Sequence, residues 1–178
     1  MRKTALLFYF FSLIFCIGCD KIDEEEATKV VDNFYKIHDQ NDNDFRKMDT
    51  LLLSRDLIDL IRKTKKREEQ EIELIKNSAY PTDKPFTVDG DLFTRVNEGI
   101  YNHKILEVKL FKNKIKVLVE FNNKTYKELT NYADVILIPD NGWKVDNIIF
   151  KKYEGNKSIQ EDLKKYIYDT KLNFVSTN

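Results

Sequence analysis

One stretch of the sequence decides the fold: Leu106-Glu107-Val108-Lys109-Leu110-Phe111-Lys112-Asn113-Lys114-Ile115-Lys116-Val117-Leu118-Val119-Glu120-Phe121. Apolar residues alternate with charged ones on both sides of Asn113. Because side chains of a β-strand point alternately to the two faces of a sheet, this alternation predicts two strands joined by a turn at Asn113. The inward residues would be Leu106, Val108 and Leu110 in the first strand and Ile115, Val117, Val119 and Phe121 in the second.

The following residues continue the sheet. Turns are predicted at Asn122-Asn123 and at Asp140-Asn141-Gly142, where turn-forming residues separate the apolar runs. The inward residues would be Ala133, Val135 and Leu137 in the third strand and Trp143, Val145, Ile148 and Phe150 in the fourth. The inward phase shifts within that fourth strand, which predicts a bulge near Asp146-Asn147 that bends the sheet.

Helical patterns lie on both sides of these strands. Ser54 can cap a long helix from Arg55 towards Lys76, and Ser158 opens a capping box for a last helix. The inward residues would be Ala27, Val30, Val31, Phe34, Tyr35 and His38 in a first helix, Phe45, Met48, Leu51 and Leu52 in a short one, and Leu57, Ile58, Ile61, Ile72 and Ile75 in the long one. The charged run 62–71 would lie on the solvated face of the long helix.

This order of elements predicts an α+β fold, with N-terminal helices packed on a bent antiparallel sheet and a C-terminal helix. We expect one domain over residues 27–152, followed by the C-terminal helix and tail over residues 153–178. The chain has 178 residues with 30 basic and 30 acidic side chains. No concentrated basic face is present, so a nucleic-acid partner is not expected.

The N-terminus has the layout of a secretory signal peptide. Arg2 and Lys3 precede an uncharged run, residues 5–17, in which Ser12 is the one residue with an aliphatic hydroxyl. A membrane-spanning helix needs about 20 apolar residues, and this run ends before Asp20. A cleaved signal over residues 1–18 is therefore favoured, with an uncleaved anchor as the alternative.

The end of the run, Gly18-Cys19, resembles the processing site of bacterial lipoproteins, although Cys16 stands where those proteins usually have Leu. The resemblance implies that Cys19 becomes the first mature residue and carries acyl chains such as palmitate, and two or more chains hold a protein stably on a membrane. Residues 19–26 would form an acidic tether in the bacterial cell envelope. Asp20 fits an inner-membrane retention signal in enterobacteria and an export cue in other bacteria, so the leaflet stays open.

Few residues suggest chemistry. Cys16-x-x-Cys19 resembles a redox or metal motif, but its first cysteine lies in the segment expected to be removed. His38 is interpreted as a residue at the edge of the core, and the acidic and amide-rich loop 38–44 lacks the glycine and distal glutamate of a calcium loop. With no Gly-rich phosphate loop, no Ser-centred elbow and no paired histidines at ligand spacing, neither a cofactor nor a metal is expected.

Asp89 and Asp91 are the most suggestive carboxylates. An aspartate beside a tyrosine or histidine can abstract a proton next to a carbonyl, and His103 would be the second group, with Tyr80 or Tyr101 as alternatives. In the structural interpretation, which is favoured, Asp89-Gly90 makes a turn, Asp91 caps the following backbone, and Leu92 and Phe93 close the core.

The stretch Pro85-Phe86-Thr87-Val88-Asp89-Gly90-Asp91-Leu92-Phe93 resembles the signature of an uncharacterised bacterial envelope lipoprotein family. Three other stretches add to the resemblance: Phe34-Tyr35, Leu52-Leu53-Ser54 and Gly142-Trp143-Lys144-Val145-Asp146. It covers residues 27–152 and implies a cone-shaped fold similar to nuclear transport factor 2, in which helices cradle a curved sheet around a pocket. It implies no activity.

Two functions are consistent with these observations. The first is a non-enzymatic binding or interaction module held on the envelope by Cys19, with an envelope protein or a small apolar ligand as partner. One version is an immunity-type protein that blocks a toxin reaching the periplasm. The second is a small-molecule or lipid pocket enzyme built from Asp89, Asp91 and His103, and it predicts that these groups meet at a cavity.

Overall fold

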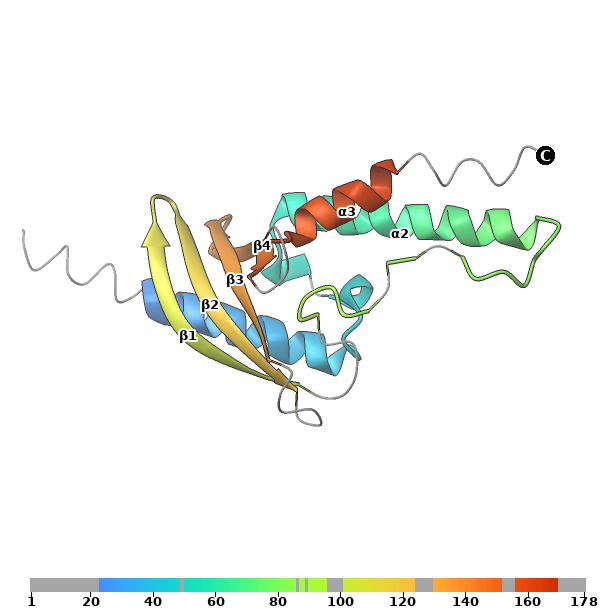
Figure 1. Cartoon of the computed structure of the whole chain (residues 1–178). Helices are drawn as coiled ribbons and strands as arrows, with labels where there is room; N and C mark the ends of the chain where they lie inside the picture. The colour runs from blue at the N-terminus through green and yellow to red at the C-terminus, as the bar shows by residue number, and fades with distance from the viewer. Residues whose placement is uncertain are drawn as a thin grey trace, which may run out of the picture.

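The computed structural model describes residues 23–48, 50–85, 87–88, 90–95, 101–123, 130–151 and 156–169. The N-terminal helix takes in residues 23–40, including residues 23–26 that were assigned to the acidic tether. The later elements are η1 (Phe45–Lys47), η2 (Thr50–Leu52), α2 (Arg55–Lys76), β1 (Tyr101–Phe111), β2 (Lys114–Asn123), β3 (Thr130–Pro139), β4 (Trp143–Phe150) and α3 (Ile159–Tyr168). The α+β prediction is confirmed (Figure 1).

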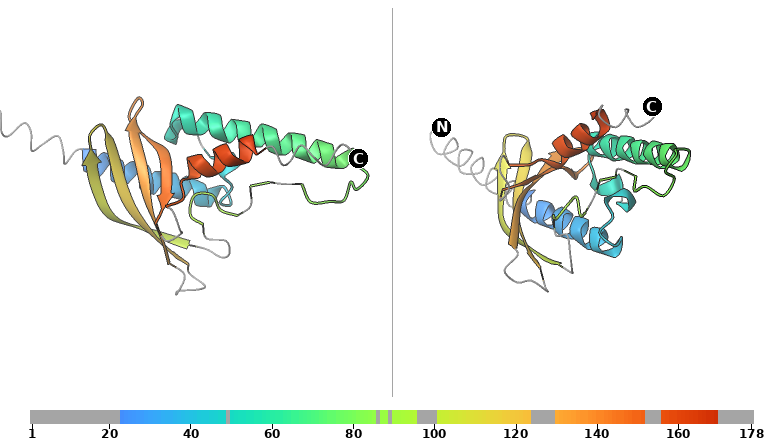
Figure 2. Two further views of the ribbon diagram at one scale, coloured as in Figure 1. Left: turned by 45° about the horizontal axis from the view of Figure 1, so that its top comes forward. Right: turned by 45° about the vertical axis from the view of Figure 1, so that its right-hand side comes forward.

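The strands form an antiparallel meander in the order β1-β2-β3-β4. The predicted inward residues of β2 and β3 are buried: Ile115, Val117, Val119, Phe121, Ala133, Val135 and Leu137. The N-terminal helix crosses the face of the curved sheet (Figures 1 and 2), and its buried stripe of Ala27, Val31, Phe34 and Tyr35 joins those strand residues in one core. This apolar contact is what fixes the helix on the sheet.

Two bulges bend the sheet. Ile136 lies opposite Asn147 and Leu137 lies opposite Val145, so Asp146 is the extra residue and the predicted bulge in the fourth strand is confirmed. A second register shift, between Ile105 and Glu107, makes Leu106 an extra residue in β1. The prediction that Leu106 points inward is therefore wrong, and its side chain is 42% exposed. A bulge displaces the alternation by one residue, which places Ile105 on the inner side in place of Leu106. Val108 packs against the core as predicted, whereas Leu110, also predicted inward, is 48% exposed at the end of the sheet.

The turns follow the sequence in two of three places. Lys112 and Asn113 connect β1 to β2, and Lys112 has φ 58°. Asp140-Asn141-Gly142 connects β3 to β4 with positive φ at its last two residues. Asn122 and Asn123 still pair with β1, so the turn predicted there is wrong and the described part of β3 starts at Thr130.

Helix α2 has the predicted bounds, because Ser54 caps it by accepting a hydrogen bond from the backbone N–H of Leu57 at 3.2 Å. Its first half buries Leu57, Leu60 and Ile61, as an amphipathic helix should. Its second half buries polar residues instead. The inward position predicted for Ile72 is wrong, and part of the charged run that was assigned to solvent is buried: Thr64, Glu68 and Glu71.

The short segments differ from a regular helix. The predicted short helix is two 3-10 turns, η1 and η2. Phe45 of η1 and the following Met48 are buried, and Leu51 of η2 is exposed. Helix α3 begins after Ser158, as predicted, and packs along α2 through Leu163 and Tyr166 (Figures 1 and 2). Together α2 and α3 form an arm that projects from the sheet. None of the described helices combines the length and hydropathy that crossing a membrane requires.

Candidate functional site

Asp91 is buried beside the N-terminal helix, with 7% of its surface exposed. Its Oδ1 accepts hydrogen bonds from the backbone N–H groups of Phe93 at 2.9 Å and Thr94 at 3.2 Å. Its Oδ2 accepts a short hydrogen bond from the Thr94 hydroxyl. Both oxygens are therefore engaged by the next three residues, which is the capping role that the structural interpretation predicts.

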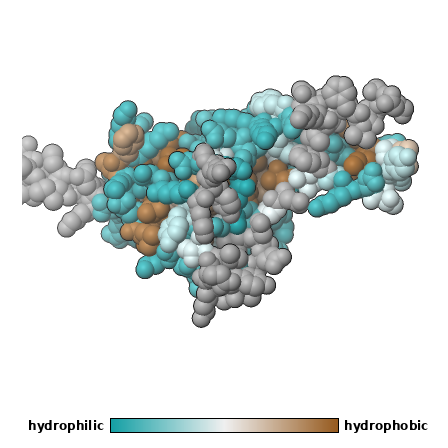
Figure 3. All heavy atoms as spheres, viewed as in Figure 1, coloured by the Kyte–Doolittle hydropathy of each residue, from teal (hydrophilic) through white to brown (hydrophobic). Residues whose placement is uncertain are grey.

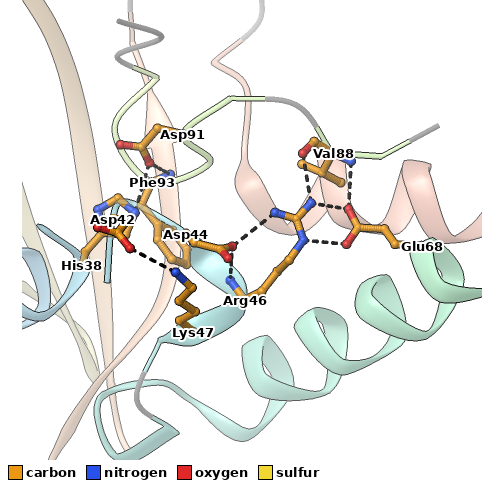
Figure 4. A network of polar contacts seen from close by, with 9 residues as sticks. All are labelled: His38, Asp42, Asp44, Arg46, Lys47, Glu68, Val88, Asp91 and Phe93. Carbon is orange, nitrogen blue, oxygen red and sulfur yellow. Dashed lines mark hydrogen bonds and ion pairs between the residues drawn. The ribbon is translucent and has the colours of Figure 1, made fainter. Parts of the chain in front are cut away.

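His38 lies between Asp91 and Tyr101, and these three residues form the His38 cluster. The Nδ1 atom of His38 is 3.1 Å from the Tyr101 hydroxyl, and its Nε2 atom is 3.2 Å from Oδ1 of Asp91 (Figure 4). That second approach is close enough for an ion pair but is not aligned as a hydrogen bond. Asp91 is therefore held mainly by its own backbone, and His38 mainly by Tyr101.

Aromatic rings enclose the His38 cluster. The imidazole lies 5.2 Å from the ring of Phe93 and is nearly parallel to the ring of Phe34. Burial raises the pKa of Tyr101, and the charge of Asp91 adds to the increase. Burial also raises the pKa of Tyr35, whose hydroxyl donates to the carbonyl of Phe93 at 3.4 Å. Phenols held neutral in this way are poor general bases at neutral pH.

The structure does not bring His103 to Asp91. The Nε2 atom of His103 is 2.9 Å from Oδ1 of Asp32 at the exposed edge of the N-terminal helix. Along β1, Tyr101 reaches His38 and His103 reaches Asp32, because the strand and the helix run past each other. Tyr80 lies far along the chain beyond α2 and is 70% exposed. Asp89 lies outside the described residues.

A second polar network joins three segments. The guanidinium of Arg46 binds the carboxylate of Glu68 through Nε at 2.6 Å and through Nη2, and Nη2 also donates to the Val88 carbonyl at 3.1 Å (Figure 4). The backbone N–H of Val88 donates to Glu68 at 3.0 Å. The hydrogen bonds that Arg46 donates to Glu68 raise the pKa of Arg46. The network clamps the segment before Asp91 against α2 and η1.

The sequence analysis missed this network, although a signal was present. Glu68 continues the spacing of Leu57, Ile61 and Thr64 along one face of α2. A charged residue at a stripe position predicts a buried partner, because an unpaired buried carboxylate is costly. The partner, Arg46, is 22 residues away, and no local pattern in the sequence connects them.

Two of the hollows that described residues line are shallow and have volumes of about 290 and 230 Å³. Both are smaller than the ~300–1,000 Å³ of typical small-molecule sites, and neither includes Asp91 or His103. Phe34, Tyr35, Phe93 and Phe121 fill the space between helix and sheet. No group of three potential metal ligands occurs among the described residues. The meeting of Asp91 and His103 at a cavity, which the enzyme hypothesis predicts, is therefore absent from the described part of the chain.

The stretches that carry the family resemblance meet in pairs. Phe34 and Tyr35 pack on Phe93 of the central stretch, with ring centroids of Phe34 and Phe93 5.1 Å apart. The Ser54 hydroxyl donates to Asp146 at 2.8 Å, and its backbone N–H donates to the Val145 carbonyl at 2.9 Å. These contacts build the scaffold, and none of them leaves a reactive group facing solvent.

The fold and the site define an α+β protein with an aromatic core around a buried histidine–aspartate–tyrosine cluster. No family model, curated protein or solved structure matches the chain. Cys19, the residue expected to carry lipid, lies outside the described residues.

Proposed function

We propose that this chain is a lipid-anchored envelope lipoprotein that acts as a non-enzymatic binding or interaction module. One observation carries the non-enzymatic part: Asp91 is buried and bound by its own following backbone. A carboxylate in that state is closed off from a substrate, because a general base must lie within hydrogen-bonding reach of the proton that it abstracts. His103 is paired with Asp32, so no contact among the described residues favours an enzyme that uses Asp89, Asp91 and His103.

A protein partner is favoured over a small apolar ligand. The aromatic rings that could have lined a pocket are packed against one another, with Tyr35 and Phe121 at 5.0 Å between ring centroids. The projecting arm, in contrast, exposes apolar side chains at Ile72, Leu74 and Tyr168. Exposed apolar groups on a rigid element are what a partner surface can cover. An immunity-type role, in which the partner is a toxin entering the periplasm, is one version of this proposal.

The test is capture of the partner from chemically cross-linked, detergent-solubilised envelopes with the tagged full chain. A matched pair of variants locates the surface, because Leu74 on the arm and Leu106 on β1 are both exposed leucines. We expect one partner to be enriched by the wild-type chain, lost with Leu74→Asp and retained with Leu106→Asp. Repeated capture without enrichment, or a turnover of substrate that His103→Gln abolishes, would contradict a binding module.

A further inference from the structure

The hairpin tip between β1 and β2 exposes two consecutive apolar side chains. Leu110 is 48% exposed and Phe111 is 64% exposed. Polar residues are the usual choice next to a hairpin turn, so two exposed apolar residues here are unusual. The ammonium group of Lys112 lies 5.6 Å from the ring centroid of Phe111, and Lys114 begins the next strand. Leu110 pairs with the buried Ile115 and Phe111 pairs with Lys114, so the tip carries one exposed apolar side chain on each face of the hairpin, with lysines beside Phe111.

This tip lies at the end of the molecule where the described chain begins. Leu110 lines a shallow hollow together with Asp23 and Glu24, the first residues of the N-terminal helix. The β3–β4 turn is at the same end, since a Cβ on Gly142 would lie 4.0 Å from Oε1 of Glu26. Figure 1 shows the hairpin tip above the start of that helix, and Figure 3 shows hydrophobic atoms gathered at this end.

The preceding residues limit how far this end can lie from a membrane. Asp23 follows Cys19 by four residues, and four extended residues span at most about 14 Å. If the apolar run 5–17 stays uncleaved instead, it ends six residues before Asp23, or about 21 Å. With either form of anchorage the hairpin tip would lie beside the bilayer surface, because the arm extends from the opposite end of the molecule (Figure 1).

We propose that Leu110 and Phe111 insert into the interfacial region of the bilayer and fix the orientation of the body on the membrane. The inference rests on the proposed anchorage and adds a second point of contact to it. Apolar side chains gain by leaving water, and neighbouring lysines can extend their ammonium groups to the lipid phosphates. Because Asp23, Glu24 and Glu26 lie at the same end, the contact is apolar and does not depend on anionic lipid.

The chain offers a clean fluorescence test, since Trp143 is its one tryptophan. The full chain, in a Trp143→Phe background, carries either Phe111→Trp at the hairpin tip or Tyr80→Trp beyond the far end of α2. Both positions are highly exposed, so neither substitution should disturb folding. Each protein is reconstituted into vesicles of phosphatidylcholine that has brominated acyl chains, and vesicle-bound protein is isolated by flotation.

We expect brominated lipid to quench the Phe111→Trp probe several-fold more strongly than the Tyr80→Trp probe. Equal quenching of the two probes on floated vesicles would overturn the inference and leave the anchorage standing. A Phe111→Trp probe that is shielded from aqueous acrylamide yet unquenched by lipid would indicate a protein cover and would also overturn it. Protein that does not float contradicts both the anchorage and the inference.

Discussion

In the body of the molecule, formed by the N-terminal helix, the sheet and residues 90–95, the side chains that meet at the centre are aromatic and aliphatic. Phe34, Phe93 and Phe121 are fully buried there. Along the arm, formed by residues 64–76 of α2 with α3, the buried face of α2 is polar and contains Thr64, Glu68 and Glu71, whereas α3 buries Leu163 and Tyr166. The same helix α2 changes from one kind of contact to the other after Ile61.

The apolar contacts of the body and the polar contacts of the arm have different roles: the first stabilise the fold, and the second fix where segments lie. Apolar burial stabilises by roughly 25 cal/mol per Å² and tolerates small displacements. A buried ion pair adds little net stability, because desolvation offsets the attraction, yet it requires a defined geometry. We infer that the body supplies most of the folding free energy and that the Arg46–Glu68 network sets how the arm and the segment before Asp91 are placed.

The largest expected effect comes from removing a ring at the centre of the body. Phe93→Ala should lower the free energy of unfolding by about 3–5 kcal/mol, because it deletes buried contacts and leaves a cavity. The measurement is denaturant unfolding followed by circular dichroism. Phe111→Ala, at the exposed hairpin tip, is the matched control and should change stability by less than about 0.5 kcal/mol. Similar losses for both would contradict the aromatic core.

A smaller effect is expected in the arm network. Glu68→Gln should cost about 1–3 kcal/mol, because it leaves the partly buried Arg46 guanidinium without its carboxylate. Glu69→Gln, at the exposed neighbouring position, should be close to neutral. In Glu68→Gln, the backbone amides around Val88 should exchange hydrogen faster than in the wild-type chain, while the amides of β2 and β3 should stay protected. Loss of protection spread evenly over the sheet would show that body and arm are one unit.

Substitutions at the junction between body and arm should lower the free energy of unfolding by less than Glu68→Gln does. Ser54→Ala removes the cap on Leu57 and the hydrogen bond to Asp146 and should cost about 1 kcal/mol. Ser158→Ala removes the corresponding cap of α3 and should cost a similar amount. The thermal midpoints of the two variants, compared with wild type, check this. An unchanged midpoint for Ser54→Ala would mean that α2 does not depend on its contact with β4.

The smallest effect is visible only in alkali. Burial raises the pKa of Tyr101 in the body, and burial with the charges of Glu68 and Glu71 raises the pKa of Tyr166 in the arm to about 12. Above about pH 10 the unfolded tyrosines lose protons that the folded ones keep, so the free energy of unfolding falls as pH rises. Tyr101→Phe should make this fall shallower, whereas Tyr80→Phe, at an exposed position, should leave its slope unchanged. Identical slopes for the two variants would contradict the burial of Tyr101.

Local signals predict part of this structure well. The bounds of α2 follow from the Ser54 cap, and the bulge at Asp146 follows from a phase shift within one strand. The predictions that were wrong concern residues whose positions depend on partners far away in the chain. Leu106 turns outward because β1 shifts its register against β2, and Glu68 is buried because Arg46, 22 residues earlier, meets it. The meeting of His38 with Asp91 and Tyr101 likewise joins His38 to two residues that lie more than fifty positions later in the chain, and no spacing rule connects them.

We propose that Cys19 holds this body on a membrane, where it acts by binding. Metabolic labelling with radioactive palmitate in a bacterial host that processes lipoproteins tests it most directly. We expect label on the wild-type chain and on Cys16→Ser, and we expect Cys19→Ser to carry no label and to accumulate as precursor. Unchanged labelling of Cys19→Ser, or no label on the wild-type chain, would contradict it.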